Sequence, residues 1–259
     1  TCLNFWETNN FDHGINWFSY SKAQLLYLYD KPEMSYQILK SVEDKLASNI
    51  GFFPVTKFNF YFCLSITAIY HLKDEQKKQN LFKSLEKYQE QIAKWAENCK
   101  ENFLHKYLLI EAEKMRLIGN VLQAQNLYDE SIELAIKNGF IQDEALGNEL
   151  CAKFWLILGK KEFAVIYLRR AYYGYTTWGA AAKVKLLEIK YPFLIARDYE
   201  TDQNFFSGGT IISRTTTQKN TRMEANLSLD FVSVMKASQI ISGEIILEKL
   251  LSSLMKVLA

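Results

Sequence analysis

Gly174 and Gly179 are the two residues of this chain that come closest to a phosphate-binding loop. Such a loop needs glycines, so that the backbone can approach the phosphates, and a lysine directly after the last glycine. Here Ala180 follows Gly179, and the surrounding sequence has a helical pattern with no strand before it. We therefore predict that this segment does not bind a nucleotide.

Histidines and cysteines could hold a metal if three or four of them converged. The three histidines, His13, His71 and His105, have no second histidine four residues away. The cysteines, Cys2, Cys63, Cys99 and Cys151, stand far apart and form no CxxC pair. We predict that His71 and His105 are polar helix residues, that the thiols are reduced and structural, and that no metal is bound.

The signatures of a protein-kinase catalytic core are missing from the chain. Asp230 and Phe231 are followed by Val232, and neither a His-Arg-Asp motif nor the glycine-rich loop is present. There is also no nucleophile-elbow spacing. We therefore predict no catalytic residue and no cofactor in this segment.

Acidic side chains cluster in the middle of the chain, at Glu111, Glu113, Asp143, Glu144 and Glu149. Glu111 falls on the apolar stripe of its predicted helix, and a carboxylate buried without a partner is costly. We predict that it bonds to a neighbouring helix. A general acid or base is the minor alternative.

An aromatic run at Tyr172, Tyr173, Tyr175 and Trp178 has two interpretations. Tyr172, Tyr175 and Trp178 could line a concave groove that binds a protein or peptide. Alternatively, the rings pack between adjacent helix pairs, which is the more common use of such a run.

The composition of the chain predicts that these residues lie on helices. With 3 Pro and 11 Gly in 259 residues, the chain favours long helices over a β sandwich. Its net charge of +2 gives no electrostatic reason to expect nucleic acid or a membrane surface. The longest apolar run, 58–70, is too short to span a bilayer, so we expect a cytoplasmic protein.

The spacing of apolar residues predicts an all-α fold. We expect helices at 15–29, 32–47, 57–72, 75–99, 101–118, 121–138, 141–158, 161–178 and 180–191, with a loop at 48–55. From Ala196 to Met223 the sequence is rich in Thr, Ser, Asn and Gly, which predicts a flexible linker. A helical stripe resumes at Leu229 and continues to Ile241.

A repeat of 40 residues is visible within the helical part. Ala112, Gly119, Ala124 and Gly139 fall on Ala152, Gly159, Ala164 and Gly179. Small residues allow paired helices to approach closely, and glycine suits a turn that needs a positive φ. We predict stacked antiparallel helix pairs, with Gly119 and Gly159 in the turn inside each pair.

The motif LGKKEFA (158–164) is similar to a tetratricopeptide repeat. Four further stretches resemble the central helical region of multi-sensor hybrid serine/threonine and histidine kinases: WAENCKENFLHKYLLIEAE (95–113), LYDESIELA (127–135), EALGNEL (144–150) and YTTWGA (175–180). LDFVSVMKASQIISGEIILEKLL (229–251) resembles the helix that leads into the GAF sensor domain of that family.

The resemblance implies the order of domains and a function. It implies the end of an upstream module at 1–14, a tetratricopeptide-like domain at 15–195, a linker at 196–224 and the opening helices of a truncated GAF-type domain at 225–259. In that family a kinase-like domain and an ATPase-like module precede this region, and a histidine-kinase core of a two-component system follows it. We therefore expect a non-catalytic segment that couples these modules, whose partners are domains of the same chain and, through the C-terminal helix, a second copy. The alternative is an adaptor that binds a partner in its concave groove.

Overall fold

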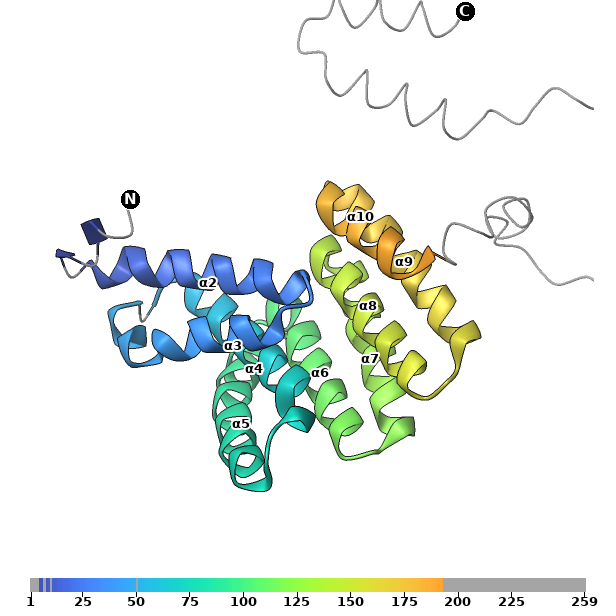
Figure 1. The fold of residues 1–259 in the computed structure, drawn as a ribbon, viewed down its shortest axis with the longest axis horizontal. Coiled ribbons are helices and arrows are strands. Elements are labelled where there is room, and N and C mark those ends of the chain that lie inside the picture. The colour runs from blue at the N-terminus through green and yellow to red at the C-terminus, as the bar shows by residue number, and fades with distance from the viewer. Residues whose placement is uncertain (1–4, 7, 10, 50, 193–259) are drawn as a thin grey trace, which may run out of the picture. The chain divides into compact units, whose positions relative to one another are not determined.

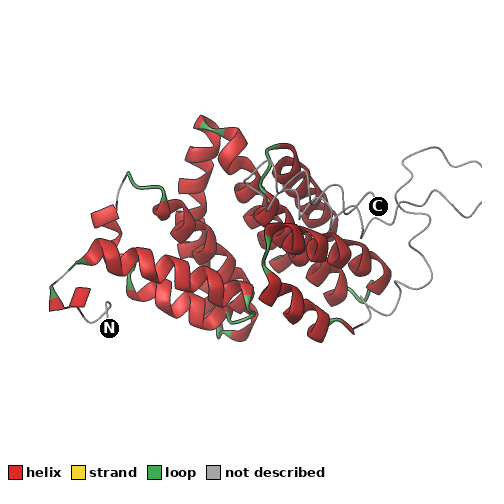
Figure 2. Cartoon of the chain, turned by 90° about the horizontal axis from the view of Figure 1, so that it is seen from above, coloured by secondary structure: helices red, strands yellow, loops and turns green. Residues whose placement is uncertain are grey.

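A computed structural model of the chain describes residues 5–6, 8–9, 11–49 and 51–192. Every regular element in these ranges is a helix (Figure 2), which confirms the expected all-α fold. The α-helices are α2 (Asp12–Leu28), α3 (Pro32–Ser41), α4 (Pro54–Ile69), α5 (Glu75–Asn98), α6 (Lys100–Leu117), α7 (Val121–Lys137), α8 (Ile141–Ile157), α9 (Lys161–Trp178) and α10 (Ala181–Lys190); two 3-10 helices are η1 (Glu43–Asn49) and η2 (Tyr70–Leu72).

The helices pack as successive hairpins: α2 with α3, α4 with α5, α6 with α7, and α8 with α9 (Figure 1). The first helix of each hairpin also contacts the first helix of the next, so that α2, α4, α6 and α8 form one row, here called the inner row. Helix α10 packs on α9. This arrangement is the stacked-pair architecture of tetratricopeptide-like repeats.

Local sequence explains where several helices begin. The Asp74 carboxylate accepts a hydrogen bond of 2.9 Å from the Lys77 amide at the start of α5, and Asn120 accepts one of 3.3 Å from the Gln123 amide at the start of α7. These side chains satisfy amides that have no partner inside the helix. Pro32 opens α3 in the same way that proline opens many helices, because its missing N–H is not needed there.

The turns inside the repeated hairpins are made by glycine, as predicted. Gly119 has φ +80° and Gly159 has φ +71°. The alanines that the repeat aligns, Ala112 with Ala152 and Ala124 with Ala164, are all fully buried. Both turns therefore depend on a left-handed residue, and both hairpins close on small side chains.

The segment after α3 differs from the prediction of one helix over 32–47. The α-helix ends at Ser41, and η1 follows it. Tertiary contacts account for the change, since the Lys45 carbonyl accepts a bond of 2.9 Å from Asn16 and Lys45 Nζ reaches Asp12 at 2.7 Å, both on α2. The predicted loop at 48–55 is also too long, because α4 already begins at Pro54.

Helix α4 carries the aromatic core. It packs against α2, α3, α5 and α6, so nearly all of its faces are buried, as its strongly apolar sequence predicts. Phe58 makes edge-to-face contacts with Tyr20 on α2 and Tyr88 on α5, both at 5.4 Å between ring centroids. Such contacts add about 0.5–1.5 kcal/mol each beyond area burial.

Cys63 and Cys151 are fully buried free thiols, as expected for structural cysteines. Burial raises the pKa of both thiols, which keeps them protonated and unreactive. None of the described helices is long and apolar enough to cross a membrane.

Some expectations fall, in whole or in part, outside the described residues. They concern Cys2, the upstream module at 1–14, the end of the domain at 15–195, the linker at 196–224, the GAF-type module at 225–259 and the dimer helix at 229–241. They stay predictions.

We expect Gly159→Ala to lower the free energy of unfolding by about 1–2 kcal/mol, because alanine is strained at positive φ. No atom lies within 4 Å of an added Cβ at this position, so the change is conformational and not steric. Urea unfolding measures the loss. Gly159→Asn is the matched control and should cost less, since asparagine tolerates this conformation; equal stability of Gly159→Ala and the unsubstituted protein would contradict the prediction.

Candidate functional site

The C-terminal ends of the four inner helices meet around one small cavity of about 180 Å³. Its lining residues come from α2, the turn after it and the start of α3, from α4 and η2, and from α6 and α8: Tyr27, Asp30, Pro32, Ala68, His71, Glu113, Arg116, Leu150, Lys153 and Ile157. The ends of helices carry unpaired carbonyls and a partial negative charge. Positively charged side chains at this cavity would therefore stabilise the helix ends.

Lys183 of α10 supplies one of these cations from the far end of the described chain. Its side chain is 2% exposed, and Nζ donates to the Leu28 carbonyl at the end of α2. Nζ also lies 2.8 Å from Oε1 of Glu149, a fully buried residue of α8. The bond to Leu28 joins residues 155 positions apart in the sequence.

Glu149 is the centre of this buried cluster. Its Oε1 lies 2.9 Å from Lys153 Nζ, and its Oε2 accepts a bond of 2.8 Å from the Tyr175 hydroxyl on α9. Burial on its own would raise the pKa of Glu149, but Lys153 and Lys183 outweigh it and lower the pKa below the ordinary range. Burial lowers the pKa of Lys183. The carboxylate is thus held ionised between two cations.

Asp30 extends the cluster to the turn after α2. It is the one described residue other than glycine with a positive φ, +57°. Its Oδ1 lies 2.9 Å from Lys153 Nζ and its Oδ2 lies 2.9 Å from Lys190 Nζ. Burial would raise the pKa of Asp30, but the two lysines outweigh it and lower the pKa to about 2.

Arg116 of α6 binds a carbonyl at the C-terminal end of α4, as Lys183 does at the end of α2. Its Nη2 donates to the Thr67 carbonyl in the last turn of α4 at 3.2 Å and to Oε2 of Glu113 at 2.6 Å. The buried Tyr128 hydroxyl of α7 donates to the other carboxylate oxygen of Glu113. We call Asp30, Glu113, Arg116, Glu149, Lys153 and Lys183 the polar clamp.

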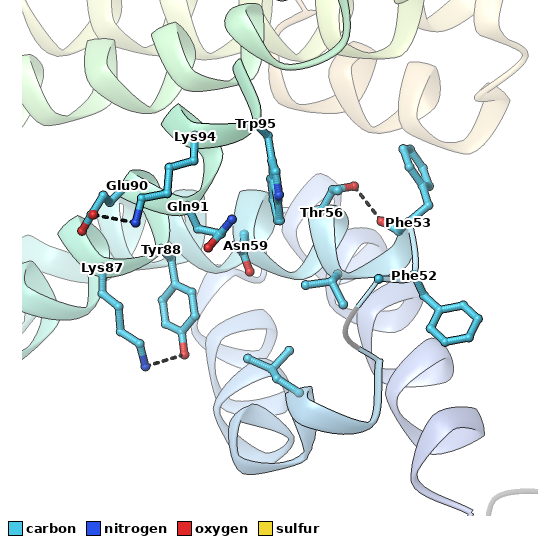
Figure 3. A pocket seen from close by; sticks show the side chains of 13 residues that line it. Phe52, Phe53, Thr56, Asn59, Lys87, Tyr88, Glu90, Gln91, Lys94 and Trp95 are labelled. Atoms are coloured by element: carbon cyan, nitrogen blue, oxygen red, sulfur yellow. Dashed lines mark hydrogen bonds and ion pairs between the residues drawn. The ribbon is translucent and has the colours of Figure 1, made fainter. Parts of the chain in front are cut away.

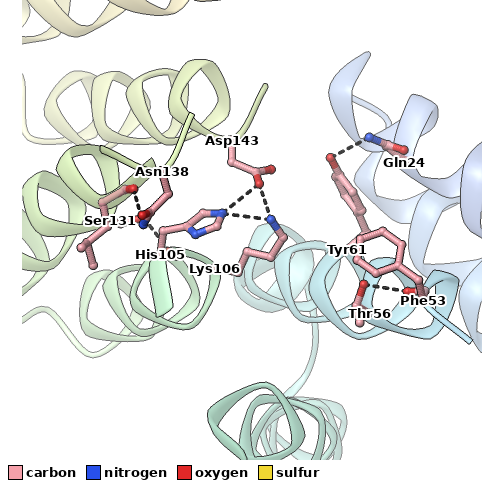
Figure 4. Close-up of polar contacts among 10 residues, drawn as sticks. Gln24, Phe53, Thr56, Tyr61, His105, Lys106, Ser131, Asn138 and Asp143 are labelled. Carbon is pink, nitrogen blue, oxygen red and sulfur yellow. Dashed lines mark hydrogen bonds and ion pairs between the residues drawn. The ribbon is translucent and has the colours of Figure 1, made fainter. Parts of the chain in front are cut away.

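A second buried ion group lies elsewhere on the inner row, between α6 and α8 (Figure 4). His105 Nε2 lies 2.9 Å from Oδ2 of Asp143, and Lys106 pairs with the same carboxylate oxygen. Phe140 stacks on His105 at 4.6 Å and lies under the Lys106 ammonium group at 4.8 Å. Burial lowers the pKa of His105, which favours the neutral ring. The group ties two inner helices together.

Of the carboxylates singled out from the sequence, Glu111, Glu113, Asp143 and Glu149 bond to side chains of other helices. Glu111 accepts a bond of 2.5 Å from Gln89 on α5, which confirms the predicted bond to a neighbouring helix. The most deeply buried acids are Glu113, Asp143 and Glu149.

The sequence analysis missed Asp30, Lys153 and Lys183. One signal for Lys183 was present, because it stands at i, i+4 and i+8 spacing with Leu187 and Tyr191, which are both buried.

The three residues of the predicted groove differ in burial, although the Tyr175 and Trp178 rings lie 6.3 Å apart. Tyr175 is fully buried in the cluster around Glu149. Tyr172 donates to Glu188 of α10 at 3.0 Å, and Trp178 is 39% exposed. The groove stays a prediction, and Tyr175 could take part in it only if the cluster around Glu149 opened.

Stacked helix hairpins with glycine turns and an inner row define a helical-repeat protein of the tetratricopeptide-like class. A family model described as CHK1-like, TPR repeats matches residues 28–167, which is more than half of the chain. No curated protein and no solved structure matches the chain. The chain belongs to the family of CHK1-like tetratricopeptide repeats, and its role is that of a helical scaffold or protein-interaction domain.

We expect Lys183→Met to lower the free energy of unfolding by about 3 kcal/mol, since it removes one of the two cations that hold the buried Glu149 carboxylate and leaves the Leu28 carbonyl without its buried donor. Lys185→Met removes an exposed lysine from the same helix and should cost less than about 0.5 kcal/mol. Thermal and urea unfolding of both variants measure the difference. Equal stability of the two would show that the buried pair contributes nothing.

Asp30→Asn should make the free energy of unfolding depend less on pH in acidic solution. The unfolded pKa of aspartate is about 3.9, and the folded pKa of Asp30 is about 2. Its contribution is therefore fully present above pH 4 and is lost as the pH falls toward 2. The stability difference between the unsubstituted protein and the variant should be about 2 kcal/mol at neutral pH and should shrink below pH 4.

Asparagine tolerates positive φ as aspartate does, so this substitution removes the charge without adding backbone strain. Denaturant unfolding from pH 7 to pH 2 measures the difference. Glu133→Gln, at an exposed position on α7, is the control. A difference that stays constant across this range would contradict the assignment.

Proposed function

We propose that this chain is a non-catalytic coupling segment of a larger, cytoplasmic signal-transduction kinase. The observation that carries the proposal is the polar clamp, which joins the end of α2 to α8 and α10. Helix repeats that contact only their neighbours bend and fray in sections. In this proposal the bonds from the end of α2 to α8 and α10 make these helices move as one body.

The clamp gives the coupling a physical route. A displacement of α2 would break the buried bond between Lys183 and the Leu28 carbonyl and would separate Asp30 from Lys153 and Lys190. Because that separation costs free energy, α10 would move together with α2. The resemblance in residues 95–180 supports the identity of the flanking modules, which are kinase and ATPase domains before the segment and sensor and histidine-kinase domains after it.

In this proposal the partners are domains of the same chain. The chain would form a dimer through the helix at 229–241, which lies outside the described residues. No catalytic residue of the kinase reaction is placed within 15–195.

The coupling itself is tested by hydrogen exchange. Lys183→Met should increase amide exchange in α2 and α3 as well as in α10, because it cuts the bond between them. Lys185→Met should leave exchange in α2 unchanged. Faster exchange confined to α10 would overturn the coupling role.

The regulatory role is tested in the full protein that contains the chain. Signal-dependent autophosphorylation should be lost in Lys183→Met and in a deletion of 15–195, with basal phosphotransfer retained. Lys185→Met should respond normally. Normal regulation in both altered proteins would remove the proposal.

A further inference from the structure

A larger cavity lies away from the clamp, at the beginning of α4 (Figure 3). It has a volume of about 650 Å³, within the range of ligand-binding pockets. The wall on one side is the C-terminal half of α5, and the other walls are η1, residues 51–53 and the first turns of α4. None of its lining residues belongs to the polar clamp.

The apolar part of the cavity is aromatic and reaches the surface. Tyr88 and Trp95 of α5 form its inner wall. Phe52 and Phe53 stand at the opening and are 52% and 72% exposed. Large apolar side chains exposed side by side at an opening are typical of interaction surfaces.

Asn59 points to a ligand independently of the apolar wall. It is 3% exposed and lines the cavity, yet its side-chain amide makes no hydrogen bond to any described residue. Other buried amides donate a hydrogen bond: Gln89 to Glu111, Asn16 to the Lys45 carbonyl and Asn148 to the Glu144 carbonyl. A bound peptide group would satisfy both the donor and the acceptor of Asn59.

The rim of the cavity on α5 is polar and carries two lysines. Lys87, Gln91 and Lys94 lie at i, i+4 and i+7, on one face of the helix. The two lysine side chains are 69% and 58% exposed. Lys94 pairs with Glu90 at 2.8 Å, but exposed ion pairs of this kind are weak and exchange readily for another anion.

We propose that this cavity binds a peptide segment of a partner protein that carries a bulky apolar side chain next to an acidic one. The apolar side chain packs between Phe53 and Trp95, and a backbone amide of the peptide bonds to Asn59. The acidic side chain faces Lys87 and Lys94. A peptide fits better than a small compound because the aromatic surface continues past the opening onto Phe53 and the lysines lie along a helix face.

The site differs from the predicted groove at Tyr172, Tyr175 and Trp178, which lie on α9. It opens between η1 and α5, and the second helix of a hairpin supplies its charges. The chain could therefore hold a partner while the clamp stays closed.

The test is to select peptides that bind the full chain from a random-peptide phage library and to measure their affinities by titration. We expect them to share a large apolar residue and a neighbouring Asp or Glu. Nuclear magnetic resonance should show shifts of the Asn59 side-chain amide and the Trp95 indole on binding. Recovered peptides without an acidic residue, or shifts confined to other sites, would overturn the proposal.

Two variants separate binding from folding. Asn59→Leu removes an unpaired buried amide, so it should melt at the same temperature or higher while binding about tenfold more weakly. A lower melting temperature with unchanged affinity would show that Asn59 serves packing alone.

Lys87→Glu with Lys94→Glu should weaken binding of acidic peptides and strengthen binding of the same peptides with Lys in place of Asp and Glu. Lys137→Glu with Lys185→Glu makes the same change of net charge at exposed positions outside the cavity, and should leave both affinities unaltered. Equal effects of the two double variants on affinity would show that net charge alone explains the result, and would overturn the site.

Discussion

The buried ion pair of Glu149 and Lys183 is the interaction on which the rest of the arrangement depends. Removing two charges from water costs several kcal/mol for each ion, and only excellent geometry recovers that cost. Here Glu149 accepts from Lys153, Lys183 and Tyr175, and Lys183 also caps a helix carbonyl. Because α2, α8, α9 and α10 each supply a partner, the pair is satisfied only when all four are in place.

The electrostatics of helix ends explain why charges are buried at this point. The inner helices direct their C-terminal carbonyls toward one cavity, and Arg116 and Lys183 each bind such a carbonyl from another helix. Asp30 acts differently, because its carboxylate draws the cations Lys153 and Lys190 to the end of α2. Glycine would fit its backbone more easily, but glycine has no carboxylate to hold Lys153 and Lys190. The backbone strain is retained for the sake of the charge.

The two polar regions of the molecule differ in how completely they are satisfied. The clamp pairs each of its charged side chains with an opposite charge, which suits an element that holds helices together. At the cavity beside α5, Asn59 is buried and unbonded, and two phenylalanines face solvent. Unsatisfied groups of this kind lower stability without a ligand and are therefore expected at binding sites. In this chain the clamp and the cavity proposed to bind a peptide are therefore lined by separate residues.

The sequence by itself determined the helices, the 40-residue repeat and its turns, because these depend on local properties: apolar spacing, capping side chains and the positive φ of Gly119 and Gly159. It also indicated that Glu111 would bond to another helix. It could not place the end of α3, where contacts from Asn16 and Asp12 stop the helix. Only the tertiary structure decided which acids meet which lysines, since Lys183 and Leu28 are joined across 155 positions and nothing local marks either as a partner of the other. Long-range pairing depends on how the stacked hairpins curve, and that curvature is the sum of many small packing angles that no single stretch of sequence encodes.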